Sequence, residues 1–154
     1  MICVIGIGNV LRGDDGIGIN IIQRLQEIFR DNANLKFINF GEAGLGLINT
    51  IKQFPEVLLI DAVDAGLQPA AMRIFSLEEA VIKNSSENFS THELTLSGVF
   101  QLLKGLGLKV KVFVAGIQVK DMGYGKGLSD ELRERAEVIT QEIVSYLRDI
   151  KELK

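Results

Sequence analysis

Short apolar runs alternate along this chain with segments of helical periodicity, and this alternation constrains the fold more than any other feature. The clearest runs are Ile2–Gly6 and Val57–Ile60, which contain no polar residue. Runs of this length and composition are typical of strands that are buried on both faces of a sheet. Further strands are predicted at Leu35–Gly41, Ala71–Phe75 and Val110–Gly116.

Between these runs, apolar residues recur at the spacing of one helix face. The first helix is predicted from a stripe made by Ile17, Ile21, Ile22, Leu25, Ile28 and Phe29. Shorter helices are predicted at Leu45–Phe54, at Leu77–Ile82 with Ser76 as its N-cap, and from His92 to a glycine stop at Gly105 and Gly107. The last helix follows a Gly-rich loop at Val119–Gly127 and has Ser129 as its N-cap; its apolar stripe is Leu132, Ala136, Ile139, Ile143, Leu147 and Ile150.

Strands that alternate with helices predict a mostly parallel sheet with helices on both faces. We therefore expect a single three-layer α/β domain over residues 1–154, with a twisted sheet of about five strands. The only cysteine, Cys3, lies in the first strand, so it is predicted to be buried, and a chain without an internal disulfide fits the reducing cytoplasm. The net charge of −3 disfavours nucleic-acid binding, and no apolar run is long enough to suggest a membrane span.

A glycine turn, Gly6-Ile7-Gly8-Asn9, follows the first strand and leads into Asp14-Asp15-Gly16. The dinucleotide-binding fingerprint requires a third glycine where this chain has Leu11, and no Gly-Lys-Ser/Thr phosphate loop is present. Asp14 and Asp15 also put negative charge where a phosphate would meet the helix N-terminus. The turn therefore predicts an acidic site and no nucleotide cofactor.

Two carboxylates and the only histidine are the candidate functional residues. Asp61 directly follows the run Val57–Ile60, and Asp15 lies in the turn after the first strand. Ligands of open α/β sheets bind at the carboxyl ends of strands, so we expect Asp15 and Asp61 to come together there, with His92 as a third member. Asp14 is instead expected to cap the helix that follows it.

Two carboxylates and one imidazole can hold a metal ion that keeps open coordination positions. A permanent structural zinc needs four ligands that usually include cysteine, so any metal is expected to bind weakly or transiently. His92-Glu93 does not continue into a zincin motif because position 96 is Leu, and there is no Gly-x-Ser-x-Gly nucleophile elbow. A triad of His92 with Ser90 or Ser97 stays open at this point, although the spacing does not favour it.

The segment Gly6–Gly18 resembles the N-terminal signature of the hydrogenase maturation endopeptidases. The resemblance continues at Leu58–Asp64 and Ser90–Leu94, and shorter similarities occur at Gly41–Gly44 and Gly116–Gln118. These segments follow the order of the family's motifs and extend over most of the chain. The chain departs from the family at Gln118-Val119, where many members carry a proline, so the loop that follows is expected to differ in shape.

The resemblance implies an aspartic-type endopeptidase that removes the C-terminal extension from the nickel-loaded large-subunit precursor of a [NiFe] hydrogenase. By position, the family's nickel-contacting carboxylates fall on Asp15 and Asp61, and its histidine falls on His92. The same three residues are thus predicted as metal ligands and as catalytic residues. The nickel would belong to the substrate and serve as the recognition element. The family fold that this implies, a sheet flanked by helices of phosphorylase/hydrolase-like type, agrees with the pattern of strands and helices.

The sequence alone leaves the hydrolytic chemistry and two competing functions open. Either the metal or a carboxylate such as Asp15 or Asp61 activates water, and backbone N–H groups of Gly6–Asn9 or Gly41–Gly44 stabilise the oxyanion. The competing functions are a non-hydrolytic metal-sensing binding module or chaperone for a hydrogenase subunit, and a small nucleotide-binding protein. A monomer in the cytoplasm is the expected state.

Overall fold

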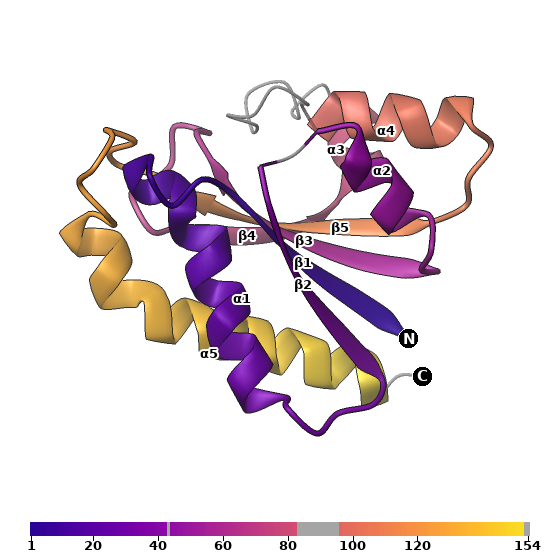
Figure 1. Ribbon diagram of the computed structural model, residues 1–154, viewed down its shortest axis with the longest axis horizontal. Helices are drawn as coiled ribbons and strands as arrows, with labels where there is room; N and C mark the ends of the chain where they lie inside the picture. Colours follow the sequence, from indigo (N-terminus) through magenta and orange to yellow (C-terminus); the bar gives the residue numbers. More distant parts are fainter. Residues whose placement is uncertain (43, 83–95, 153–154) are drawn as a thin grey trace.

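A computed structural model of the chain describes residues 1–42, 44–82 and 96–152. Over these residues the chain forms one five-stranded sheet with helices on both faces (Figure 1). The strands are β1 (Ile2–Ile7), β2 (Leu35–Gly41), β3 (Glu56–Val63), β4 (Met72–Ser76) and β5 (Lys111–Gln118). The helices are a short 3₁₀ helix η1 (Gly13–Gly16), α1 (Ile17–Ile28), α2 (Gly46–Ile51), α3 (Leu77–Ile82), α4 (Leu96–Gly105) and α5 (Asp130–Glu152).

The strands lie in the order β2-β1-β3-β5-β4. β1 runs parallel to both β2 and β3, and β3 runs parallel to β5. β4 alone joins the sheet antiparallel, at the edge beside β5. The predicted mostly parallel α/β class is therefore confirmed.

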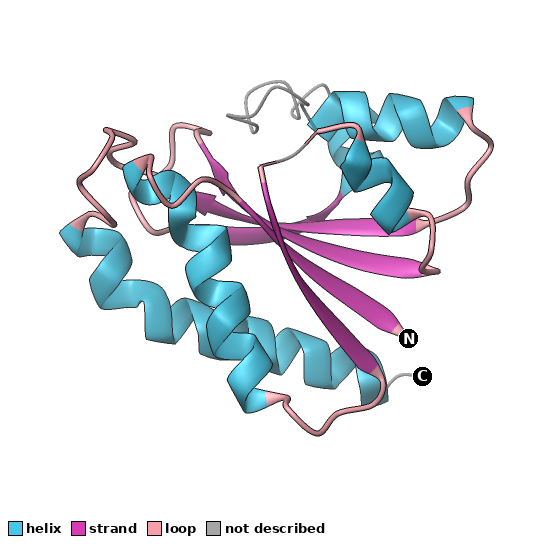
Figure 2. Ribbon diagram, viewed as in Figure 1, coloured by secondary structure: helices cyan, strands magenta, loops and turns pink. Residues whose placement is uncertain are grey.

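The two faces of the sheet are covered by different helices, as Figure 2 shows: α1 and α5 lie on one face, and α2, α3 and α4 lie on the other. Successive strand residues point to opposite faces. Val4 and Ile60 accordingly pack in the core beneath α1 and α5, whereas Ile5 and Leu59 pack beneath α2 and α4. None of the described helices is long and apolar enough to cross a membrane.

The ends of two elements differ from the sequence expectation by three residues, whereas the other described strands differ by two at most. α2 covers only Gly46–Ile51, because the backbone N–H groups of Gln53 and Phe54 bond three residues back and tighten the chain out of the α-helix. β3 continues beyond Ile60 to Val63, since β5 pairs with its whole length. Asp61 therefore lies within a strand instead of following one.

Several of the predicted helix signals are confirmed. The N–H of Glu79 donates to the Ser76 hydroxyl at 3.4 Å, as expected of an N-cap, and Gly107 ends α4 with a φ of 69°. The predicted stripe of α5 is buried except for Ile150, which is partly buried. Ile28, predicted to be in the stripe of α1, is 41% exposed because it lies at the open end of that helix. The predicted helix start at His92 lies outside the described residues.

The close approach of α1 to the central strands depends on Gly6 and Gly18. A Cβ on Gly6 would lie 2.7 Å from the carbonyl oxygen of Gly18. A Cβ on Gly18 would lie 2.4 Å from the oxygen of Ile7 and 2.5 Å from that of Ile60. Both neighbours are backbone atoms of the sheet, which cannot move without disturbing strand pairing. The helix therefore lies directly on the backbone of β1 and β3.

We predict that Gly18→Ala destabilises the fold by about 3 kcal/mol, because the added methyl group overlaps two strand carbonyls. The melting temperature should fall by about 10 °C in a circular dichroism melt. Gly105→Ala is the control, since a Cβ there meets nothing within 4 Å, and it should leave the melting temperature unchanged or slightly raised. Equal melting temperatures for the two variants would contradict the close packing.

Cys3 lies fully buried in β1, as predicted. Burial in apolar surroundings raises the pKa of its thiol to about 12, and the charge of Lys36 only partly opposes this. Because the native state holds the thiol proton more tightly, the free energy of unfolding should fall as pH rises from about 9 towards 12.

We predict that native Cys3 reacts with Ellman's reagent at pH 8 about a thousandfold more slowly than in guanidinium chloride, where the thiol has its ordinary pKa. Absorbance at the released thiolate band measures both rates on the same sample. Comparable rates in the two conditions would show that Cys3 is accessible in the folded protein.

Candidate active site

Asp15 lies in η1, at the carboxyl end of β1, and is completely buried. The turn before it is tight because Gly8 has a φ of 148°, and a Cβ there would lie 2.0 Å from the carbonyl oxygen of Asp15. The backbone N–H of Asn9 donates to Oδ2 of Asp15 at 2.9 Å. The glycine turn therefore fixes both the backbone and one carboxylate oxygen of Asp15.

Asp61 lies in β3 opposite Gly116 of β5, and only 1% of it is exposed. By strand alternation its side chain is on the same face as Leu59, the face that α2 and α4 cover. Ile60, the residue before it, pairs with Gly6 at the end of β1. Asp61 thus follows the last paired position of β1 and β3.

The two predicted carboxylates therefore lie at the same edge of the sheet, where η1 packs against β3. The predicted third member, His92, lies outside the described residues. Within residues 1–42, 44–82 and 96–152, no group of three or more metal-ligating side chains is found. The set of Asp15, Asp61 and His92 as ligands and catalytic residues stays a prediction.

Asp14 does not cap α1, which corrects the sequence expectation. Its carboxylate is completely buried and accepts hydrogen bonds from the backbone N–H groups of Lys120, Asp121 and Ser129, at 2.8, 2.9 and 2.6 Å. The Ser129 hydroxyl adds a fourth at 2.9 Å. Successive side chains of a 3₁₀ turn diverge by about 120°, so Asp14 points to the loop before α5 while its neighbour Asp15 points elsewhere.

A further backbone hydrogen bond and two ion pairs also stabilise the loop before α5. The N–H of Asp14 donates to the Asp121 oxygen at 2.9 Å. Lys126 lies 3.2 Å from the Asp121 carboxylate, and hydrogen bonds from Gly123 and Lys126 lower the pKa of Asp121. The hydrogen bond and charge of Lys120 likewise lower the pKa of Glu131. The Gly-rich loop is thus ordered against the turn that carries Asp15.

Gln118 is a structural residue that the sequence did not reveal. It is buried where β5 ends; its Oε1 accepts from the N–H of Ala65 at 2.8 Å, and its Nε2 donates to Asp64 at 3.0 Å. These bonds hold the loop between β3 and β4. The one sequence signal was the expected departure from the family's pattern at Gln118-Val119.

Asn9 connects the site to a further acidic residue. Its side-chain amide donates to Oε1 of Glu42 at 2.9 Å, while its backbone N–H binds Asp15. The Gly8 N–H donates to Gly41 at 2.9 Å. The Gly8 and Asn9 donors are thus engaged in the structure, and the rest of Gly6–Asn9 belongs to β1. The oxyanion role of this segment stays a prediction. The Gly41–Gly44 alternative includes Ala43, which lies outside the described residues.

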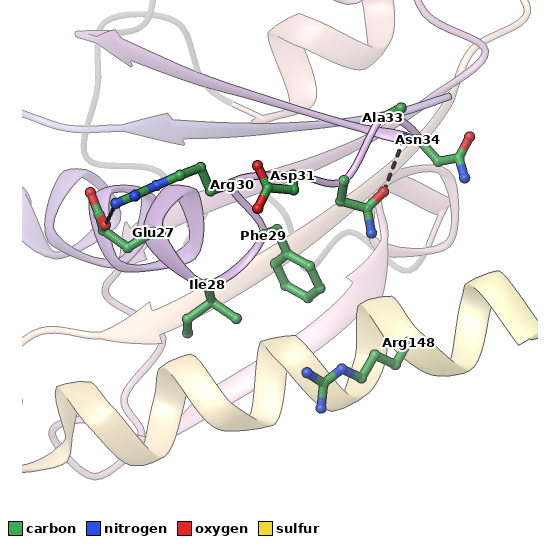
Figure 3. Close-up of a pocket in the computed structure, with 9 residues that line it drawn as sticks. Glu27, Ile28, Phe29, Arg30, Asp31, Ala33, Asn34 and Arg148 are labelled. Carbon is green, nitrogen blue, oxygen red and sulfur yellow. Dashed lines mark hydrogen bonds and ion pairs between the residues drawn. The ribbon is translucent and has the colours of Figure 1, made fainter.

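A surface groove lies far from these carboxylates. Figure 3 shows it where α1 ends and β2 begins, with Arg148 of α5 on its far side. Within it, Arg30 pairs with Glu27, and the Arg148 guanidinium lies 5.9 Å from the centre of the Phe29 ring. The groove is at the amino ends of the strands, opposite the candidate site.

Comparison with protein families matches residues 19–146 to the hydrogenase maturation protease family HycI. The hydrogenase expression/formation protein HoxM of Cupriavidus necator is 30% identical over 151 residues, covering 96% of this chain and 74% of that protein. A putative hydrogenase maturation protease of Methanocaldococcus jannaschii is 28% identical over 156 residues, covering 97% of this chain and 96% of its own.

The similar solved structures are also hydrogenase maturation proteases. The [NiFe] hydrogenase maturation protease HycI of Thermococcus kodakarensis has a TM-score of 0.77 and 28% identity, over 96% of this chain and 92% of its own. The hydrogenase maturating endopeptidase HybD of E. coli, at 23% identity and the same coverage, has a similar fold with a TM-score of 0.80.

The fold and these comparisons define an endopeptidase. The chain belongs to the hydrogenase maturation protease family. The resemblance and the enzyme class predicted from the sequence are therefore confirmed. The family match includes the positions of Asp61 and His92 and begins four residues after Asp15.

We predict that Asp14→Asn destabilises the protein by about 3 kcal/mol, because either orientation of the amide sets an NH₂ group against an N–H donor. Urea unfolding measures the loss. Hydrogen exchange should also accelerate at the amides of Lys120, Asp121 and Ser129. Asp149→Asn, at an exposed position of α5, is the control and should change neither quantity. Unchanged protection of the three amides would contradict the proposed anchoring.

Proposed function

We propose that this protein removes the C-terminal extension of a nickel-loaded [NiFe]-hydrogenase large-subunit precursor, and that it recognises the nickel carried by that substrate. The observation that supports this most is the pair of buried carboxylates, Asp15 and Asp61, at one edge of the sheet in a member of the maturation protease family. We propose that the protein acts as a cytoplasmic monomer.

In this proposal, Asp15, Asp61 and His92 complete the coordination of the substrate's nickel. Carboxylate and imidazole groups are suitable ligands for a divalent metal of this kind. Buried carboxylates carry a desolvation cost that an incoming cation offsets. Binding is then strong only when nickel has been inserted, so cleavage reports correct loading of the precursor.

Hydrolysis adds water across one peptide bond: the water oxygen bonds to the carbonyl carbon, the C–N bond breaks, and the amine leaves with a proton. A metal ion polarises the carbonyl or bound water, and a nearby carboxylate can accept a proton. Nickel held against Asp15 and Asp61 would place the scissile bond beside both kinds of group.

We predict that the protein shortens a nickel-loaded precursor and leaves its nickel-free form intact, because only the first offers a metal to the carboxylates. The precursor encoded in the same genome is incubated in both forms, and the mass of each is followed by mass spectrometry. Equal cleavage of the two forms would refute nickel recognition. Binding without any change in mass would instead favour a non-hydrolytic chaperone.

We predict that Asp15→Asn, Asp61→Asn and His92→Ala each lower the cleavage rate of the nickel-loaded precursor by about a hundredfold or more, since each removes a metal ligand or proton acceptor. Asp31→Asn, an exposed carboxylate at the far groove, is the matched control and should keep full activity. Melting curves verify that the variants fold. Full activity in any of the first three would remove that residue from the site.

A further inference from the structure

Four large apolar side chains are exposed around the edge of the sheet that carries Asp15. Their exposed fractions are 58% for Val10, 65% for Leu11, 74% for Leu45 and 74% for Tyr124. We call these four residues the apolar rim. They come from three segments that follow different strands: the turn after β1, the start of α2 and the loop after β5.

Hydrogen bonds join these segments into one surface. The N–H of Gly125 donates to the Leu11 oxygen at 3.0 Å, and the Arg12 guanidinium lies 5.8 Å from the centre of the Tyr124 ring. On the other side, Asn9 donates to Glu42, just before the start of α2. Leu45 directly precedes α2, which covers one face of the sheet, whereas the segments that carry Leu11 and Tyr124 lead into α1 and α5 on the other face (Figure 1).

Hydrogen bonds fix the backbone that carries the exposed side chains of Leu11 and Tyr124. The N–H of Leu11 donates to the Asn9 side chain at 2.9 Å, and its carbonyl accepts from Gly125. The buried carboxylate of Asp14 anchors the loop that carries Tyr124. Single exposed apolar residues are ordinary, but several grouped around a functional edge mark a binding surface. Leu106 and Val138 are exposed apolar residues of the ordinary kind, since they lie away from this edge.

Arg12 indicates that this surface lacks a hydrogen-bond acceptor. Its Nε is buried and has no hydrogen-bond partner among the residues that the structure describes. An unpaired buried donor is costly, and a carbonyl oxygen is a suitable acceptor for it. The half-buried Arg12 side chain has to turn outward to use this donor. An extended polypeptide then offers it carbonyl oxygens and offers its exposed neighbours apolar side chains.

We propose that the apolar rim binds an extended, apolar segment of the hydrogenase large-subunit precursor beside its scissile bond. This inference rests on the proposed function, because it names how the same site holds its protein substrate. An endopeptidase must hold its substrate chain on both sides of the bond that it cleaves. The rim lies on both sides of the edge where Asp15 and Asp61 lie. Its contribution to binding does not depend on nickel.

The test compares Leu11→Ser and Tyr124→Ser with Leu106→Ser, which removes an equally exposed leucine, 62% against 65%, at the opposite end of the sheet. The Kd for the nickel-free precursor is measured by biolayer interferometry, since that form is bound without turnover. Cleavage of the nickel-loaded precursor gives KM and kcat. Both rim variants should raise Kd and KM about tenfold with little change in kcat, whereas Leu106→Ser should change none of them.

If both rim variants keep the wild-type Kd and KM, the proposal that the apolar rim binds substrate is wrong, whereas the proposed function is unaffected. If the rim variants weaken binding but no precursor is cleaved, the proposed function is wrong, whereas the binding role of the apolar rim is supported. Sedimentation of the protein alone supplies one further outcome: a wild-type dimer that Leu11→Ser dissociates would show that a second copy covers the rim, and would overturn the inference.

Discussion

The backbone of α1 lies directly on the backbone of β1 and β3, and the position of the candidate site depends on this contact. It is possible only because Gly6 and Gly18 have no side chains, since a Cβ on either would overlap a carbonyl oxygen. The helix is therefore held close to the sheet at its first turn. η1, which directly precedes α1, packs against β3, and its Asp15 accepts a hydrogen bond from Asn9 in the turn after β1. The placement of Asp15 thus follows from helix–sheet packing as well as from the local turn.

This arrangement buries two adjacent carboxylates, and they have different roles. A buried carboxylate is costly unless hydrogen bonds satisfy it. Asp14 receives four, all from Lys120, Asp121 and Ser129. It therefore fastens the loop before α5 to the turn. Asp15 is held by the Asn9 N–H at the edge of β3. The turn thus uses one carboxylate for structure and presents the other at the strand ends.

Much of the fold was predictable because burial on a sheet and on a helix leaves different periods in the sequence. That Asp15 and Asp61 lie at the same edge of the sheet was predictable, because the carboxyl ends of parallel strands meet at one edge. The role of Asp14 did not, since its partners are more than a hundred residues away. The exposure of Ile28 and the full length of β3 also depend on neighbours that periodicity does not identify. Gln118 was recognisable only as a departure from the family's pattern.

The candidate edge combines two environments with opposite preferences for water. Asp15 and Asp61 are carboxyl groups withdrawn from solvent, whereas Leu11, Leu45 and Tyr124 are large side chains left in it. A small anionic ligand would relieve neither condition, because it would repel the carboxylates and leave the apolar side chains exposed. A partner that carries both a cation and apolar side chains relieves both at once. A metal-loaded polypeptide is such a partner, so the sheet edge favours a protein substrate over a small molecule.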